Sequence, residues 1–200
     1  MPEAAGPTRD RSALELSQAA ELLGAYCFVE RRLFELTGAW SVEVTRPGLA
    51  VQLDAVSQQH AWHAELWADR LPVLAGIEPA SLVAPAGPAL GPVLDALAAT
   101  DTAVERLAGL YRCVLPRLLV TYGRHLRRAV PATDAPVIRA LRLVRTDELA
   151  AWQVGEAQLE VLIDTPDAAR AAAATVGVLE ATLASGLAGP GLVPWPGQRT

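Results

Sequence analysis

The chain has 200 residues, and 52% of them are hydrophobic, which is sufficient for the core of a single domain. The formal net charge of −5 argues against a general nucleic-acid binder, because phosphate neutralisation requires a cationic surface. The two cysteines, Cys27 and Cys113, form no Cys-x-x-Cys pair, which excludes a disulfide framework and a cysteine zinc site and predicts two reduced thiols in the core.

Residues 1–11 lack the apolar segment of a signal peptide and are predicted to be disordered. No apolar run in the chain reaches the roughly 18 residues that a membrane span requires. We therefore expect a cytoplasmic protein with no membrane segment.

Two long helices are predicted in the first third of the chain. The segment Ser12-Ala-Leu-Glu15 has the pattern of a capping box and predicts a helix from residue 12 to about residue 38. Thr45 and Pro47 indicate the start of a second helix, which the Leu71-Pro72 step ends. Because only a short loop joins them, the two helices should lie antiparallel.

A proline- and glycine-rich segment, residues 72–92, separates this pair from the remaining helices. Its length is what a bundle needs when one connection must cross from one end to the other. After a short apolar piece at 93–99, the capping box Thr102-Ala-Val-Glu105 predicts a third helix that runs to about residue 130. Pro116 lies inside this helix and is expected to bend it.

A short turn at 131–136, capped by Thr133 or Asp134, leads to a fourth helix that extends to about residue 163. Thr165-Pro166-Asp167 predicts the start of a fifth, alanine-rich helix that ends near Gly186. The tail, residues 189–200, is expected to be a loop that lies over the bundle through Leu192 and Trp195. The predicted fold is therefore all-α, with the helical bundle spanning residues 12–188.

Four polar residues fall on the apolar faces of these helices. His60 and His63 are three residues apart and share one face of the second helix, while Glu30 and Glu148 lie on the apolar faces of the first and fourth helices. A buried imidazole needs partners, since each unpartnered polar group costs on the order of 2 kcal/mol. We therefore expect the four side chains to meet in the core, with residues 114–118 of the third helix beside Glu148.

This pattern resembles the ferritin-like superfamily, whose four-helix bundles hold two metal ions with a glutamate from each of two helices and a Glu-x-x-His motif from each of the other two. The segment 59–66 is similar to the second-helix motif, with His63 at the family's histidine and His60 at its bridging glutamate. The segment 147–152 is similar to the fourth-helix motif, with Glu148 retained and Ala151 in place of the histidine. Glu30 matches the carboxylate of the first helix.

The resemblance covers about residues 12–163 and implies a ferritin-like four-helix bundle with a long crossover between helices 2 and 3, an extra C-terminal helix and a divergent metal site. The third helix has no carboxylate near the expected layer, so one ion is expected rather than two. Two glutamates and two histidines suit Fe, Mn or Zn. In such a site Tyr26, Tyr111 or Trp152 would line the pocket.

Two functions are consistent with these residues. One is enzymatic and the other is not, so the residues leave open whether the protein is an enzyme. In the first, Glu30, His60, His63 and Glu148 bind one metal ion, and the protein is an oxidoreductase or oxygenase acting on a small-molecule substrate. In the second, the same residues pair through charge-assisted hydrogen bonds without any cofactor. The bundle then acts as a structural or partner-binding protein, for example as a homodimer.

Two further features lie around the end of the third helix. His125 is predicted to be a capping or surface residue. A cluster of arginines is interpreted as a solvated surface, with a site for an anionic substrate or partner as the alternative. The cluster comprises Arg124, Arg127, Arg128, Arg139, Arg142 and Arg145.

Overall fold

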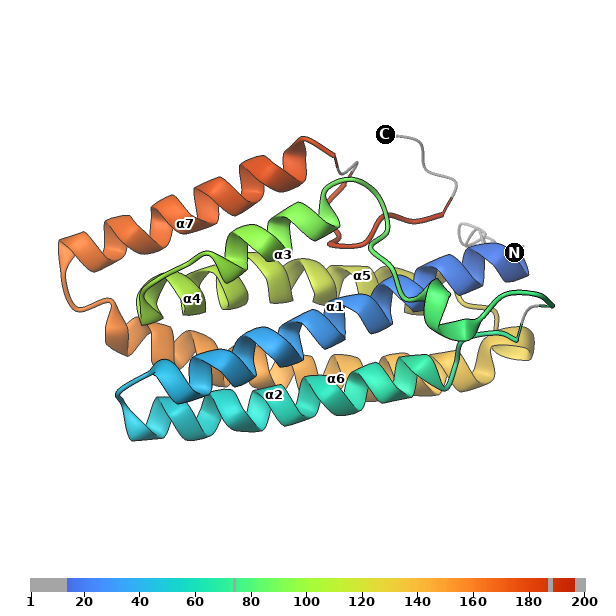
Figure 1. Ribbon diagram of the computed structural model, residues 1–200, viewed down its shortest axis with the longest axis horizontal. Helices are drawn as coiled ribbons and strands as arrows, with labels where there is room; N and C mark the ends of the chain where they lie inside the picture. The colour runs from blue at the N-terminus through green and yellow to red at the C-terminus, as the bar shows by residue number, and fades with distance from the viewer. Residues whose placement is uncertain (1–13, 74, 187–188, 197–200) are drawn as a thin grey trace, which may run out of the picture.

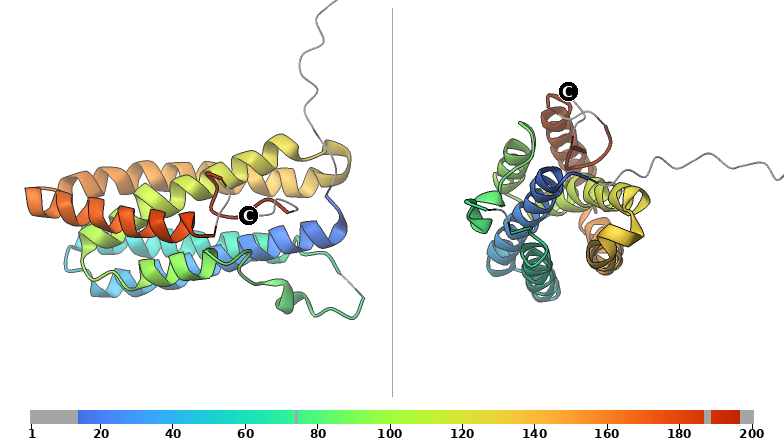
Figure 2. Two further views of the ribbon diagram at one scale, coloured as in Figure 1. Left: turned by 90° about the horizontal axis from the view of Figure 1, so that it is seen from above. Right: turned by 90° about the vertical axis from the view of Figure 1, so that its right-hand side faces the viewer.

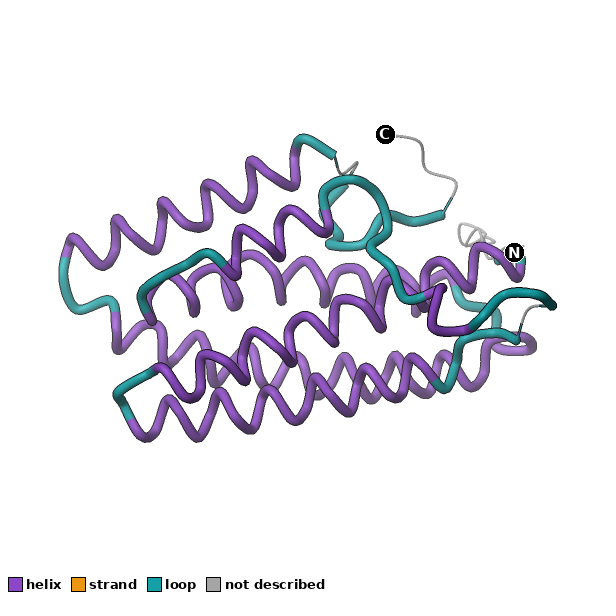
Figure 3. The backbone as a smooth tube through the Cα atoms, viewed as in Figure 1, coloured by secondary structure: helices purple, strands orange, loops and turns teal. Residues whose placement is uncertain are grey.

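The computed structural model describes residues 14–73, 75–186 and 189–196 (Figure 1). Every regular element in these ranges is a helix (Figure 3), which confirms the all-α prediction. The predicted disordered residues 1–11 lie outside the described part of the chain. The elements are α1 (Leu16–Glu43), α2 (Pro47–Ala68), η1 (Pro79–Leu82), α3 (Leu90–Ala98), α4 (Ala103–Gly109), η2 (Leu110–Val114), α5 (Leu115–Arg128), α6 (Pro131–Leu162) and α7 (Pro166–Ala184).

Four long helical segments form the centre of the molecule (Figures 1 and 2). They are α1, α2, the continuous α4–η2–α5 segment, which is named the third rod, and α6. α1 and α2 are antiparallel, as their short connection predicts. α2 and the α4–η2–α5 segment run in the same direction, because the chain between them returns along the bundle through α3. α6 packs against both α2 and α5, while α3 and α7 cover the side formed by α4.

The first helix begins later and ends later than the sequence predicts. Its N-cap is Glu15, whose backbone N–H donates to the Gln18 side chain at 3.0 Å, whereas Ser12 lies outside the described residues. The helix continues past Gly38 because this glycine serves packing rather than termination. A Cβ at Gly38 would lie 2.9 Å from the hydroxyl oxygen of Ser57, so its absence lets α2 approach closely.

The third rod contains a π-helical turn, η2, directly before Pro116. The backbone N–H of Leu115 donates to the carbonyl of Leu110, five residues back, as a π turn requires. Pro116 has no N–H to donate to the preceding turn, so the helix is already irregular at this point. The perturbation expected from Pro116 therefore takes the form of a π turn.

The start of α6 also differs from the prediction. Residues 131–136 are assigned to the helix, except that Asp134 has a non-helical backbone (φ −111°, ψ 15°) just before Pro136. The Asp134 carboxylate accepts a hydrogen bond from the Val130 N–H at 2.8 Å. Asp134 thus stabilises the turn before Pro136, whereas the predicted cap by Thr133 or Asp134 is not seen: the N-cap is Val130, and no side chain caps this end of the helix among the described residues.

The C-terminal tail lies over α5. Leu192 and Trp195 are buried, and the Leu192 N–H donates to the Arg117 carbonyl at 3.1 Å and to the Thr121 hydroxyl at 2.8 Å. The predicted contact of Leu192 and Trp195 with the bundle is confirmed within residues 189–196.

Gly24 of α1 marks the place where η1 packs on the bundle, and its replacement by alanine should be destabilising. The new Cβ would lie 1.9 Å from the backbone oxygen of Leu82, so backbone rather than a flexible side chain must move. We expect Gly24→Ala to lower the free energy of unfolding by about 1–3 kcal/mol in a urea titration. Gly177→Ala in α7 is the control, because its Cβ meets nothing within 4 Å. That change should stabilise the protein by about 0.4–1 kcal/mol, and a Gly24→Ala variant as stable as the parent would contradict the packing described here.

Candidate metal centre

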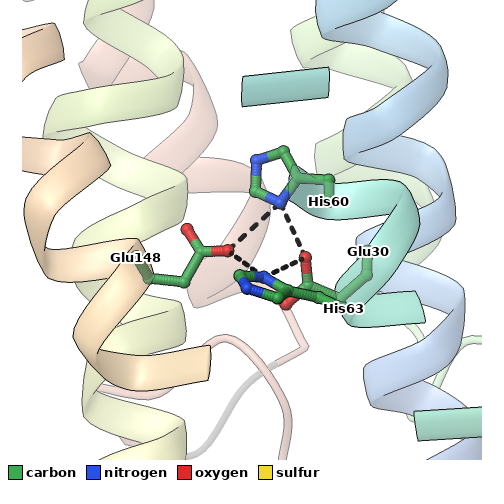
Figure 4. Close-up of side chains that lie close together, drawn as sticks. All are labelled: Glu30, His60, His63 and Glu148. Carbon is green, nitrogen blue, oxygen red and sulfur yellow. Dashed lines mark hydrogen bonds and ion pairs between the residues drawn. The ribbon is translucent and has the colours of Figure 1, made fainter. Parts of the chain in front are cut away.

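The structure brings together all four polar residues that the sequence indicated (Figure 4). Glu30 comes from the middle of α1, His60 and His63 from α2, and Glu148 from α6, and each side chain is fully buried. The two histidines reach the same point because residues three apart share a helix face. One potential ligand atom from each residue lies within 4.8 Å of the others.

The inward-facing atoms are the Nδ1 nitrogens of the two histidines and one oxygen of each carboxylate. His60 Nδ1 lies 2.6 Å from Glu30 Oε2 and 3.2 Å from Glu148 Oε1. His63 Nδ1 lies 2.9 Å from Glu148 Oε1 and 3.7 Å from Glu30 Oε2. Neighbouring ligands of a tetrahedral ion with bonds of about 2.0–2.2 Å are roughly 3.3–3.6 Å apart. The four atoms therefore lie close enough to reach a common ion once the side chains adjust, with separations of up to 4.8 Å shortening and the 2.6 Å contact lengthening, each by about 1 Å.

Two outer contacts hold the inner residues in place. The Tyr122 hydroxyl of α5 donates to Glu30 Oε1 at 2.5 Å, and His63 Nε2 faces Asp147 Oδ2 at 3.4 Å. A carboxylate behind the second nitrogen of a histidine is a common arrangement at metal sites, because it orients the ring and selects the tautomer.

Neither Tyr122 nor Asp147 is among the site residues that the sequence predicts. Tyr122 is fully buried in α5, and a buried hydroxyl requires a hydrogen-bond partner, which is the signal that could have indicated it. Asp147 lies beside Glu148 in the chain, but its approach to His63 depends on how α2 and α6 pack.

The cluster strongly shifts the pKa values of Glu30, His60 and His63. Burial alone would raise the pKa of Glu30, but hydrogen bonds and charge from His60 and His63 outweigh it and hold this pKa at about 2. Burial would lower the pKa of both histidines, but the two carboxylates outweigh it and raise the pKa of His60 to about 9 and that of His63 to about 10. Without a metal ion, these raised pKa values favour the protonated form of both imidazoles at neutral pH.

Two atoms of the cluster are buried without a hydrogen-bond partner among the described residues. They are His60 Nε2 and Glu148 Oε2. A buried carboxylate oxygen that accepts no hydrogen bond is costly unless something else satisfies it. Glu148 thus has a free oxygen with which it could also engage a cation.

The aromatic residues expected around the site have other contacts. The Tyr26 hydroxyl pairs with His125 Nδ1 at 3.2 Å, and Trp152 Nε1 donates to the backbone oxygen of Tyr111 at 2.7 Å. Within the described chain, none of Tyr26, Tyr111 and Trp152 makes a hydrogen bond or ring contact with the four-residue cluster. The side chain of the third rod that does so is Tyr122.

The prediction that His125 is a capping or surface residue is wrong. Its side chain is buried between Tyr26 and Trp195, because the C-terminal tail folds over this part of α5. Burial lowers the pKa of His125 to about 4, so this ring is neutral at pH 7. His125 is not part of the four-residue cluster, and Ala151 is also buried, at the position where the resemblance expects a histidine.

The cysteines have the environment that the sequence predicts, and the arginine cluster has it only in part. Cys27 and Cys113 are free and buried. Arg124 donates to the Val193 carbonyl at 2.8 Å, and the Arg128 guanidinium stacks 4.8 Å from the centre of the Trp195 ring, so these two half-buried arginines hold the C-terminal tail. The other four arginines of the cluster are exposed, as the interpretation of a solvated surface requires.

Comparisons of the chain with protein-family models, with curated proteins and with solved structures find no significant match. Within the described residues, no helix combines the length and the apolar character that crossing a membrane demands.

Proposed function

We propose that this chain is a ferritin-like protein that binds one divalent Fe, Mn or Zn ion through Glu30, His60, His63 and Glu148. The observation that carries the proposal is the convergence of four buried potential ligand atoms from three helices within 4.8 Å. The contacts of Tyr122 and Asp147 support it, since metal ligands are commonly oriented by such outer partners. The partnerless oxygen of Glu148 supports it as well.

Charge balance favours one ion over two. The metal-free cluster carries two imidazolium charges against two carboxylates, and one divalent ion in place of the two imidazolium protons leaves the net charge unchanged. A second divalent ion would place an uncompensated double charge in a fully buried site, which is very costly. The absence of a carboxylate where Tyr122 reaches the cluster agrees with a single ion.

We propose further that the site supports oxidoreductase or oxygenase chemistry on a small-molecule substrate. Two histidines with carboxylates suit non-haem Fe(II), and a redox-active ion would supply electron transfer to oxygen or substrate. The protein residues would hold the ion and exclude water, while Tyr122 and Asp147 fix the orientation of Glu30 and His63. The deep burial of all four ligands provides the dry environment that such chemistry needs.

A second candidate function is a metal-free bundle that acts as a structural or partner-binding protein, including as a homodimer. One observation favours it: the four groups already satisfy much of one another's charge and hydrogen bonding, with contacts of 2.6 and 2.9 Å. In this case the cluster fixes how α1, α2 and α6 pack together, and it neither binds an ion nor catalyses a reaction.

Metal content separates the two proposals. Protein purified without a histidine tag and reconstituted anaerobically with Fe(II), Mn(II) or Zn(II) should retain about one ion per chain after desalting under the first proposal, and none under the second. For the Fe(II)-loaded protein, oxygen consumption above that of free Fe(II) would support the redox role, and its absence would count against it.

The outer residues should tune metal affinity without supplying ligands. We expect Tyr122→Phe and Asp147→Asn each to weaken metal binding by roughly 10–100-fold, because both partners orient a ligand and Asp147 also raises the basicity of His63. Competition titration with a chromophoric chelator measures this directly. Tyr26→Phe is the matched control, since its hydroxyl contacts His125 rather than the cluster. Equal affinities for all three variants and the parent would show that the outer contacts do not act on a metal.

A further inference from the structure

An open groove of about 720 Å³ runs along the outer side of α6, from Pro131 to Asp147. Its lining residues among the described chain all belong to α6, and Ile138 and Leu143, both half-buried, supply its apolar surface. Arg139 and Arg142 line the same groove from the exposed face of the helix. The groove therefore combines an apolar surface with two guanidinium groups.

The two groove arginines have no acidic partner among the described residues, unlike several other arginines of the protein. Arg112 pairs with Glu156 and Arg117 pairs with Glu180. Neither Arg139 nor Arg142 forms an ion pair or side-chain hydrogen bond with any described residue. In a chain with a net charge of −5, two adjacent unpaired arginines make a local positive patch. Guanidinium groups are well suited to carboxylate, phosphate or sulfonate oxygens, which they bind in a bidentate manner.

The acid that lines the groove is Asp147, at its far end. Its carboxylate faces His63 Nε2 at 3.4 Å, so it is partly engaged by the buried cluster. Thr146 lies beside it in the groove and offers a hydroxyl. The charge that the groove presents near Arg139 and Arg142 thus remains positive.

We propose that this groove binds a small amphipathic organic anion, with its acidic group on Arg139 and Arg142 and its apolar body against Ile138 and Leu143. The inference requires no metal ion at the neighbouring cluster. A molecule bound there would lie next to Asp147, which is in turn the outer partner of His63.

Binding of 8-anilinonaphthalene-1-sulfonate, which has a sulfonate and aromatic rings, tests the proposal by fluorescence titration of the full chain. We expect Arg139→Gln combined with Arg142→Gln to weaken binding at least roughly tenfold, because each variant removes a charge-assisted hydrogen bond. The matched control is Arg127→Gln combined with Arg145→Gln. It removes the same charge from the same end of the bundle, but these residues line a different groove. The control should change the affinity less than about threefold.

Displacement experiments test the two halves of the site separately. Octanoate should displace the probe, whereas octanol and inorganic sulfate at the same concentration should not. Displacement by sulfate alone would overturn the apolar half of the proposal, and displacement by octanol would overturn the anionic half.

Equal losses of affinity in the two double variants, or none in either, would overturn the site itself. Circular dichroism melting of each variant verifies that folding is retained, which is expected because all four arginines are surface residues.

Discussion

Replacing His63 with alanine should abolish stoichiometric metal binding by this protein. His63 is expected to contribute a ligand nitrogen and to connect the centre to Asp147, so its loss removes one of four ligands together with the outer contact that orients it. We expect about one ion per chain in the parent and less than about a tenth of that in His63→Ala, measured by plasma mass spectrometry after desalting.

The third histidine provides the control for this experiment. His125→Ala removes a buried imidazole of the same size, but one that contacts Tyr26 rather than the cluster. It should retain one ion per chain even where it lowers stability.

Calorimetric metal titrations of the parent in two buffers of different ionisation enthalpy should also show release of about two protons per ion at pH 7, since both cluster histidines begin protonated. Substoichiometric metal in both the parent and His63→Ala, with no proton release, would refute the metal centre.

Replacing Glu30 with alanine should destabilise the metal-free protein by about 3–5 kcal/mol at pH 6, because it leaves buried imidazolium charge without its carboxylate. For a chain of this length, such a loss corresponds to a decrease in Tm of roughly 10 °C. Urea denaturation in the presence of a chelator measures the effect. Glu160→Ala, which removes an exposed carboxylate of α6, is the control and should change stability by less than about 0.5 kcal/mol.

This effect should depend on pH in a defined direction. The cluster raises the pKa of His60 to about 9 and that of His63 to about 10, so their contribution is complete below the ordinary histidine value of 6.5 and is lost as pH rises through 9–10. The pKa of Glu30 is lowered from 4.5 to about 2, so its contribution is complete above 4.5 and is lost as pH falls through 2. The difference between the parent and Glu30→Ala should therefore be largest between about pH 4.5 and 6.5 and decrease towards pH 10. A difference that is constant with pH would show that the cluster is not ionised in this way.

Tyr122 illustrates what helix periodicity does not give. The register between the third rod and α6 agrees with the prediction, because Trp152 Nε1 donates to the Tyr111 carbonyl and so places Glu148, one turn away, near residues 114–118. The Tyr122 hydroxyl reaches Glu30 of α1 instead, at 2.5 Å. That contact depends on how α5 and α1 face each other across the core, which the pattern of neither helix shows.

His125 shows that the pattern of a single helix also does not predict which residues near its end are buried. Nothing in its own helix distinguishes it from a capping histidine near a C-terminus. Its burial depends on a segment about 70 residues later in the chain, which is held by Thr121 and by two arginines of α5. Such a contact between distant segments leaves no periodic pattern in either of them.

The sequence by itself determined the helical class, the positions of the long helices to within a few residues, and the convergence of Glu30, His60, His63 and Glu148. It could do so because a side chain's face follows from local helix geometry, and a short connection forces α1 and α2 to be antiparallel. Only the tertiary structure decided that Tyr122 and Asp147 complete the cluster, that His125 is buried, and that Arg139 and Arg142 share a groove. Those features depend on the relative rotation and axial position of separate helices, which packing of the whole core sets and no single segment encodes.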